Sequence, residues 1–456
     1  MKMMVMAAMA AAAVAGAHPW ACYHGDPQHT GRSAVPVGDS IWTAWTYAAG
    51  GDISGSPVVS GDDKVLFAAR DVKLYRLKED GAEDWVADLV GLGTNVYFST
   101  PALDDSGNCY ITTDRRLVKV DSAGSVAWSW PGHNGLSISH SPVIGADGKV
   151  YFACYSDSLY AVTPAGTLAW GRDLGHSVNS APAAGPDGRI YIATTRGDPP
   201  WRLLAFEPDG DTAWTVELAG DADFASPTIG PDSTIYIGAD RFLYAVRPDG
   251  TVRWRDSLAA RIQTCPAIGN DSTVYVVAGS RLYNVSADSG TRWRVTVGSS
   301  GYSAPAVDGA GNVYVGSDVS AFYVVSEAGA VLTTLALPDD VWSSPAITAH
   351  GQVIVGCMNG TLFAFQGEAS GVAGPGVPRP ASGLVAWPNP TGGRVRLVGP
   401  AGLDLAAVKV YDAAGKACPT PVPTGPVLDL GSLPAGVYVV EARADAVAVR
   451  TRVIVR

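Results

Sequence analysis

The sequence lacks an excess of basic residues and lacks the short motifs that mark most enzymes. Its 456 residues carry a formal net charge of -11, which argues against nucleic acid as the main partner, because phosphate binding needs a basic face. The seven histidines show no HxH or HExxH spacing, and no GxSxG, GxGxxG or Walker pattern stands in a strand–turn–helix context. We therefore expect no catalytic residues, no metal site and no bound cofactor.

Long apolar runs are also missing, except at the N-terminus. The stretch "MKMMVMAAMAAAAVAGAHPW" has Lys2, an apolar run and a small-residue site that ends at Ala17. The run is shorter than the roughly 20 residues of a membrane-spanning helix, so a membrane anchor is the weaker alternative. We predict that residues 1–17 are a secretory signal peptide. Cys22 lacks the aliphatic residue three positions earlier that a lipoprotein site needs.

Charged residues are scarce as well, at 16%, while hydrophobic residues make up 47% and the chain has 53 glycines and 31 prolines. This composition is typical of a folded, turn-rich, all-β protein. The six cysteines are scattered, with no CxxC and no adjacent pair. An exported protein can form disulfides, but this spacing selects no pairing.

A repeat of roughly 40 residues, the spacing of propeller blades, fills most of the chain. Each copy starts with a small residue and a proline, continues through three short alternating strands joined by tight turns, and ends in a fourth strand opened by tryptophan. The starts are Ser56-Pro57, Thr100-Pro101, Ser141-Pro142, Ala181-Pro182, Ser226-Pro227, Cys265-Pro266, Ala304-Pro305 and Ser344-Pro345. The seventh unit has Leu332 or Thr333 in place of the tryptophan.

The eighth unit stops after three strands, and its fourth strand lies at the other end of the chain. The stretch "IWTAWTYAAGG" has the fourth-strand pattern with Trp45, but no first three strands precede it. Pairing of residues 41–47 with the eighth unit would close the ring and hide the sheet edges. The predicted fold is all-β: an eight-bladed β-propeller of four-stranded blades over residues 18–366.

The stretches "AVTPAGTLAW", "AFEPDGDTAW" and "AVRPDGTVRW" carry a family resemblance. They resemble a shortened tryptophan-docking motif of the quinoprotein-like (PQQ-like) propeller repeat, and the resemblance covers about Cys22 to Gln366. It implies the fold but not the activity, because this fold hosts many functions. Quinoprotein dehydrogenases of the group generally carry a vicinal disulfide and a calcium site beside a catalytic Asp, and no Cys-Cys pair exists here.

The C-terminal part has a different pattern. Residues 367–383 are a Gly/Pro/Ala linker, and residues 384–456 form short alternating stretches that predict a small immunoglobulin-like β-sandwich. This part resembles the type A sorting domain of the type IX secretion system, which implies a contact with that machinery and export across an outer membrane; the alternative is a generic immunoglobulin-like module. The matching residues are Trp387-Pro388-Asn389-Pro390, Val410-Tyr411-Asp412, Gly415-Lys416, Leu433 to Tyr438 and Arg452 to Arg456.

A candidate binding face follows from one repeat position, three residues before each proline. Half of this ring is aromatic, and aromatic side chains with polar neighbours around a concavity suit a protein loop or a sugar. The alternative is that these aromatics only plug the axis. An insertion, "TTRGDPPWRLL", adds a tryptophan that we expect to be exposed on a contact loop. The candidate residues are Phe98, Phe224, Tyr302, Trp342, Asn179, Gln263, His140, Arg116 and Trp201.

These features together predict a secreted or cell-surface protein, exported through the periplasm, that binds a protein or a glycan and is not an enzyme. One alternative is an outer-membrane protein assembly factor similar to BamB, which shares the propeller. A PQQ-dependent dehydrogenase is the disfavoured alternative.

Overall fold

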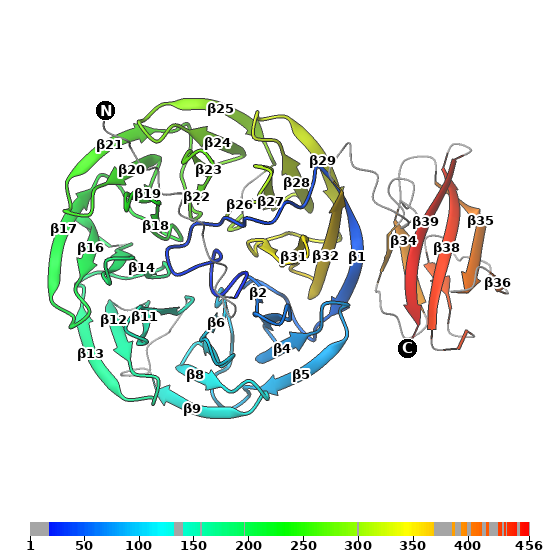
Figure 1. Ribbon diagram of the computed structural model, residues 1–456, viewed down its shortest axis with the longest axis horizontal. Helices are drawn as coiled ribbons and strands as arrows, with labels where there is room; N and C mark the ends of the chain where they lie inside the picture. Colours follow the sequence, from blue (N-terminus) through cyan, green and yellow to red (C-terminus); the bar gives the residue numbers. More distant parts are fainter. Residues whose placement is uncertain are drawn as a thin grey trace, which may run out of the picture.

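A computed structural model describes residues 18–131, 140–155, 157–195, 197–298 and 301–368, and the strands of residues 385–455 with a few adjoining residues. Eight four-stranded antiparallel sheets surround one axis (Figure 1). The predicted eight-bladed propeller is therefore confirmed. The predicted signal peptide and all of the predicted linker except residues 367 and 368 lie outside the described residues.

Each blade begins at the axis with a strand of only two residues, here called the A strand. The small-residue-Pro pair precedes every A strand and shortens it, because proline has no N–H to give to a sheet ladder. The A strands are β2 (Val58–Val59), β6 (Ala102–Leu103), β10 (Val143–Ile144), β14 (Ala183–Ala184), β18 (Thr228–Ile229), β22 (Ala267–Ile268), β26 (Ala306–Val307) and β30 (Ala346–Ile347).

The next strand outward is here called the B strand, and both of its faces are buried. Val65–Ala69 and Val150–Cys154 are buried at every residue, because each blade packs between two others. The B strands are β3 (Val65–Ala69), β7 (Cys109–Thr112), β11 (Val150–Cys154), β15 (Ile190–Ala193), β19 (Ile235–Ala239), β23 (Val274–Ala278), β27 (Val313–Ser317) and β31 (Gln352–Gly356).

The C strand is the third in each blade, and it packs against the neighbouring blade. One hydrophobic cluster, for example, joins Leu66 and Leu74 of blade 1 to Ile111 and Val118 of blade 2. The C strands are β4 (Lys73–Leu77), β8 (Arg116–Val120), β12 (Ser158–Val162), β16 (Trp201–Phe206), β20 (Phe242–Val246), β24 (Arg281–Val285), β28 (Ala321–Val325) and β32 (Thr361–Glu368).

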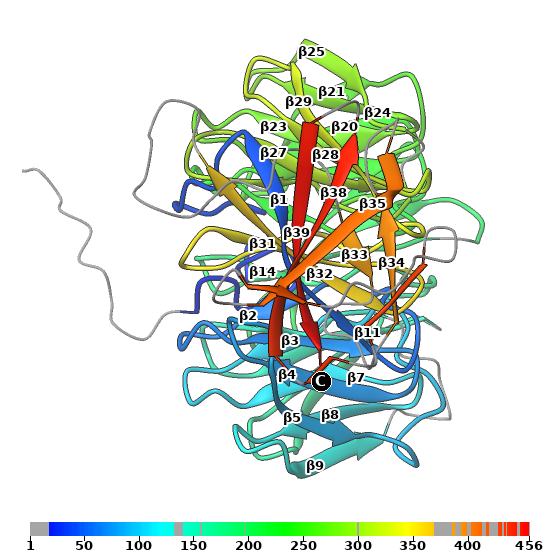
Figure 2. The same ribbon diagram turned by 90° about the vertical axis from the view of Figure 1, so that its right-hand side faces the viewer.

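The D strand forms the rim of each blade, and its side chains are largely exposed or half-buried (Figures 1 and 2). The D strands are β5 (Glu83–Asp88), β9 (Val126–Pro131), β13 (Leu168–Asp173), β17 (Thr212–Leu218), β21 (Val252–Ser257), β25 (Thr291–Thr296), β29 (Val331–Ala336) and, in blade 8, β1 (Ser40–Ala48).

Blade 8 is shared between the two ends of the propeller sequence, as predicted. Strand β1 pairs antiparallel with β32, from Ser40 opposite Glu368 to Ala48 opposite Thr361. The pairing is a little longer than the predicted residues 41–47, and β32 runs two residues past the predicted end at 366. This pairing covers the edge that blade 8 would otherwise expose.

Tryptophans of the D strands lock each blade onto the next. The indole N–H of Trp214, for example, donates to the Pro248 carbonyl at 2.8 Å, and the ring lies against Gly250, whose φ of +85° suits glycine. The same bond to the next blade's turn occurs at Trp45, Trp85, Trp128, Trp170, Trp254 and Trp293. The docking role expected from the sequence motif is therefore seen in the structure.

Thr333 occupies the register of the missing tryptophan in blade 7, opposite Val324. Its hydroxyl donates to the Asp39 carbonyl at 3.0 Å. Blade 8 receives its D strand from the N-terminal part of the chain. Thr333 therefore contacts the residue just before β1, at the place where the other blades dock a tryptophan.

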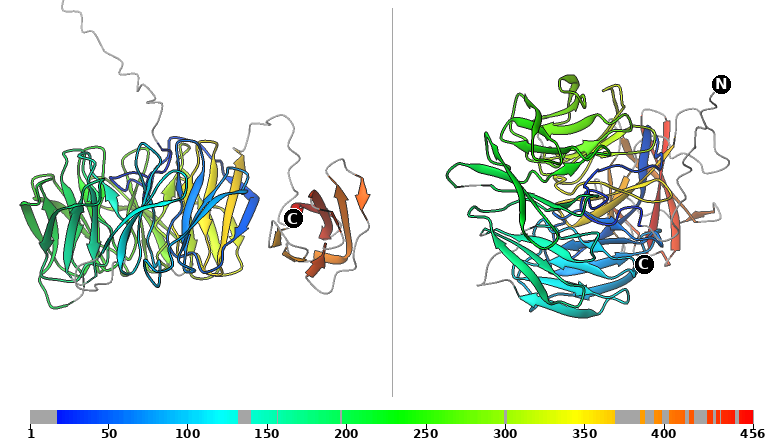
Figure 3. Two further views of the ribbon diagram at one scale, coloured as in Figure 1. Left: turned by 90° about the horizontal axis from the view of Figure 1, so that it is seen from below. Right: turned by 60° about the vertical axis from the view of Figure 1, so that its left-hand side comes forward.

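Residues 18–37, here called the hub strap, cross one end of the axis (Figures 1 and 3). Their carbonyl oxygens accept the N–H of the second residue of the A strand in blades 1, 2, 4, 5, 6 and 7. The accepting and donating residues are Trp20 and Val59, Ala21 and Leu103, Pro27 and Ala184, Gln28 and Ile229, Thr30 and Ile268, and Gly31 and Val307. The strap therefore satisfies main-chain donors that face the axis.

The C-terminal part contains two antiparallel sheets, as the predicted sandwich requires. One has the order β33 (Val385–Trp387), β34 (Arg394–Val398) and β37 (Val427–Asp429); the other has β36 (Ala417–Cys418), β35 (Leu403–Asp412), β38 (Gly436–Ala444) and β39 (Val447–Val455). Within the described ranges, no helix has the length and hydrophobicity that crossing a membrane requires.

Candidate binding site at the hub

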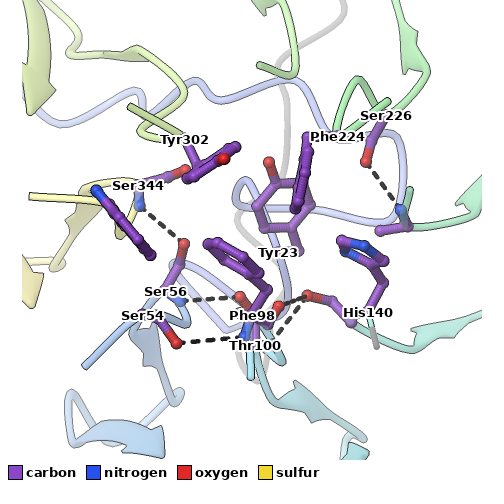
Figure 4. Close-up of a pocket in the computed structure, with 13 residues that line it drawn as sticks. Tyr23, Ser54, Ser56, Phe98, Thr100, His140, Phe224, Ser226, Tyr302 and Ser344 are labelled. Carbon is purple, nitrogen blue, oxygen red and sulfur yellow. Dashed lines mark hydrogen bonds between the residues drawn. The ribbon is translucent and has the colours of Figure 1, made fainter. Parts of the chain in front are cut away.

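Four aromatic side chains from four different blades meet at the end of the axis opposite the strap. Phe98 of blade 2 lies 5.1 Å from Phe224 of blade 5, 4.9 Å from Tyr302 of blade 7 and 5.7 Å from Trp342 of blade 8, measured between ring centroids. Phe224 and Tyr302 are 4.3 Å apart, and Tyr302 and Trp342 are 5.2 Å apart. The sequence prediction that one repeat position gathers these rings at the axis agrees with this geometry (Figure 4).

The two phenylalanines of this aromatic cluster have left-handed backbones. The φ angle is 54° at Phe98 and 61° at Phe224, a region that residues with a side chain seldom adopt. The Phe98 N–H donates to Ser54 Oγ at 3.3 Å, and the Phe224 N–H donates to the Asn179 carbonyl at 2.9 Å. The neighbouring blades therefore hold both residues in a conformation that costs about 1–3 kcal/mol each.

A ring of hydroxyl groups lies under the aromatic cluster. In five of the eight blades, the residue before the proline donates its N–H to the hydroxyl of the equivalent residue in the next blade, at 2.9–3.0 Å. The links run from Ser56 to Thr100, Thr100 to Ser141, Ala181 to Ser226, Ala304 to Ser344, and Ser344 to Ser56. The last link joins blade 8 to blade 1. The sequence showed only small residues here, whereas the structure gives the reason for serine and threonine.

A polar arc borders the aromatic cluster. His140 Nε2 lies 2.6 Å from Asn179 Oδ1, and Asn179 Nδ2 donates to Asp223 Oδ1 at 2.6 Å. Burial lowers the pKa of His140 to about 4, so the imidazole is neutral at pH 7. A neutral ring that stacks on Phe98 at 6.4 Å and meets Phe224 edge-on at 5.7 Å fits an apolar environment.

An acidic side chain lies on the other side of the cluster. Asp318, in the turn between β27 and β28, sits beside Trp342. Partial burial and the carboxylate of Asp340 raise its pKa to about 6. The aromatic end of the hub thus combines apolar rings with one neutral histidine and one carboxyl group whose pKa is raised to about 6.

Tyr23 of the hub strap reaches the axis from the opposite end. Its ring lies 5.3 Å from His29 and 5.9 Å from His24. His24 is fixed in turn, with Nδ1 2.7 Å from the His29 carbonyl oxygen and Nε2 2.7 Å from that of Pro305. A cavity of about 30 Å³ is lined both by Tyr23 and by the aromatic cluster (Figure 4). This volume holds about two water molecules.

Three of the predicted site residues do not join the cluster. Gln263 occupies the equivalent position in blade 6 and is half-buried, but it does not line the hub cavity. Arg116 points along its own blade and donates to Ser129 Oγ at 3.2 Å. Trp201 was expected on an exposed loop, and this expectation is wrong: it begins strand β16, opposite Leu218, and packs half-buried against the core between blades.

The comparisons with known proteins agree with this architecture. A family model described as outer membrane protein assembly factor BamB matches residues 33–181 and 201–292, more than half of the chain. The chain belongs to this family. None of the curated proteins matches it in sequence.

Solved structures similar to this BamB-family chain include a BamB and several dehydrogenases. BamB from Moraxella catarrhalis is 15% identical, with a TM-score of 0.61 over 72% of this chain and 100% of that one. Quinohemoprotein alcohol dehydrogenase from Comamonas testosteroni is 14% identical, with a TM-score of 0.64 over 80% and 83%. A europium-containing methanol dehydrogenase is 13% identical, with a TM-score of 0.64 over 76% and 98%. At these identities the likeness shows the fold alone.

The protein itself occupies much of the hub axis. The strap fills one end of the axis and the aromatic cluster fills the other. What the aromatic end offers is a surface of half-buried rings with polar groups beside them, which suits binding.

Proposed function

We propose that this chain is a non-enzymatic binding or scaffold protein that recognises a protein partner through the aromatic end of its hub. The observation that carries the proposal is the clustering of Phe98, Phe224, Tyr302 and Trp342 from four blades, three of them half-buried. Aromatic residues are enriched at binding hot spots, and this end lies away from the strap. Membership of the BamB family supports a protein rather than a small molecule as the partner.

The delivery of the protein is part of the same proposal. The resemblance of residues 384–456 to a type IX sorting domain supports export to the outer membrane or cell surface, and the two antiparallel sheets there are compatible with such a domain. An assembly factor similar to BamB remains the second candidate, and the family match favours it. The two candidates share a protein-binding propeller and differ in where it acts.

The test is a pull-down from the cell-surface fraction and, separately, from the periplasmic fraction, with a glycan array in parallel. We compare the native protein with Trp342→Ala and Tyr302→Ala. A matched control is Leu168→Ala, which shortens an apolar side chain that is 50% exposed on the rim strand β13. Hot-spot truncation should weaken binding by about 1–3 kcal/mol, or about 5- to 150-fold.

Each outcome decides something. A protein captured from the cell surface by the native chain and by Leu168→Ala, but poorly by Trp342→Ala, supports the proposal. A partner found only in the periplasmic fraction supports the assembly-factor candidate. Binding to glycans alone, or binding that ignores both hub variants, contradicts a protein site at the aromatic end.

A further inference from the structure

Two carboxylates and a histidine meet at the seam where blade 8 closes on blade 1, at the strap end of the propeller. Asp63 lies in the turn between β2 and β3, Glu79 in the turn between β4 and β5, and His350 in the turn between β30 and β31. One donor atom from each lies within 4.8 Å of the others. His350 Nδ1 is 3.2 Å from Glu79 Oε1 and is also in contact with Asp63 Oδ2.

The main chain holds the carboxylate of Asp63 in place. The Asp63 N–H donates to the Ser60 carbonyl at 2.9 Å, and Asp63 Oδ1 accepts the Ala349 N–H at 3.0 Å. Its other oxygen is thereby directed toward His350. The Asp63 side chain is only 10% exposed, whereas the side chains of His350 and Glu79 are 64% and 47% exposed. One ligand is therefore fixed, and two can adjust around an ion.

We propose that Asp63, Glu79 and His350 bind a divalent transition-metal ion, with Zn²⁺ as the best fit. One imidazole nitrogen and two carboxylate oxygens form a three-ligand set of the kind that zinc accepts, with a fourth position left for water or a partner's side chain. Mg²⁺ and Ca²⁺ favour oxygen ligands only, so the histidine selects against them. This inference is independent of the proposed function.

Such an ion would cross-link the two blades that close the ring. Glu79 belongs to the turn that already receives the blade 8 tryptophan, because Trp45 Nε1 donates to the Glu79 carbonyl at 2.7 Å. His350 comes from blade 8 itself, 271 residues away from Glu79 along the chain. An ion held across this seam binds the closed ring better than an opened one and so raises its stability.

The competing interpretation is a plain ion pair, in which a protonated His350 lies between the two carboxylates. Isothermal titration of untagged protein with ZnCl₂, and with MgCl₂ as the comparison ion, separates the two. We expect saturable binding of one Zn²⁺ and a higher melting temperature with Zn²⁺ but not with Mg²⁺. His350→Ala and Glu79→Gln should each weaken Zn²⁺ binding by about tenfold or more, because each removes one of three ligands.

His176→Ala is the matched control, since this half-buried histidine lies outside the cluster. It should bind Zn²⁺ as the native protein does. Absence of saturable binding, or equal binding by the native protein, His350→Ala and Glu79→Gln, would leave only an ion pair and overturn the proposal. If His350→Ala folds poorly, Glu79→Gln still tests the proposal, because it keeps the histidine and should also weaken Zn²⁺ binding.

Discussion

The left-handed backbone of Phe98 gives a sharp test of how the aromatic cluster is held. The ring is 9% exposed and contacts Phe224, Tyr302, Trp342 and His140, so truncation removes packing on several sides. Phe98→Ala should therefore cost about 3–5 kcal/mol of unfolding free energy. Replacement by glycine removes the same ring, but it also changes the conformational free energy of the backbone at residue 98.

At a φ of 54° an alanine pays about 1–2 kcal/mol that glycine does not. Glycine, in turn, costs about 0.5–1 kcal/mol through the greater freedom of the unfolded chain. Phe98→Gly should thus be more stable than Phe98→Ala by up to about 1.5 kcal/mol, with a central value near about 0.75 kcal/mol. Tyr302 holds the same repeat position with a negative φ, so there the order should reverse, with Tyr302→Gly less stable than Tyr302→Ala.

Urea unfolding followed by tryptophan fluorescence measures all four variants against the native protein, with the midpoints compared at equal slopes. If Phe98→Gly proves no more stable than Phe98→Ala, the strained backbone is not a property of the folded hub. If neither variant loses stability, the rings are a loose surface feature and not a packed cluster, and the reasoning from burial fails.

Two further predictions follow from the hub. Ser56→Ala leaves the buried Ser344 N–H without its acceptor at the seam between blades 8 and 1 and should cost about 1–3 kcal/mol; Ser226→Ala, which removes the equivalent bond between blades 4 and 5, should cost the same, and a larger loss at Ser56 in urea unfolding would show that closure is the weak point. His140 has its pKa lowered from 6.5 to about 4, so below pH 6.5 the unfolded state binds a proton that the folded state does not. Stability should fall by up to about 3 kcal/mol as the pH drops from 6.5 toward 4, and His140→Gln should lessen this slope; an unchanged slope contradicts a buried neutral ring.

The sequence was sufficient for the blades and for their closure, because both depend on local patterns. The Pro-anchored starts recur at one spacing, the alternating strands face two ways, and Trp45 marks a fourth strand with no blade before it. The pairing of β1 with β32 is what this pattern requires. A repeat also makes one position in each unit converge on the axis, which is why the aromatic cluster could be predicted.

The hub strap could not be predicted in the same way. Its residues show no alternation, and its bonds are made by main-chain carbonyls, such as those of Pro27 and Thr30, which any residue can supply. The misplaced site residues have a related cause. Whether Arg116 faces the axis or its own blade depends on the direction of its side chain, and Trp201 is half-buried because it already belongs to strand β16, after the inserted segment. Neither the direction of the Arg116 side chain nor the burial of Trp201 can be read from residue type or spacing.

The two ends of the hub differ in which atoms close them, and this difference bears on where a partner can bind. The strap end is closed by main-chain bonds to the A strands, together with buried side chains of the strap such as Trp20, His24 and His29. The aromatic end is closed by side chains alone, each from a different blade. Substitution at Phe224, Tyr302 or Trp342 therefore changes the shape and chemistry of that surface directly, while the β-sheet bonds and the tryptophan docking of the blades stay in place. A propeller built this way can change its partner at one end and keep its fold through the other.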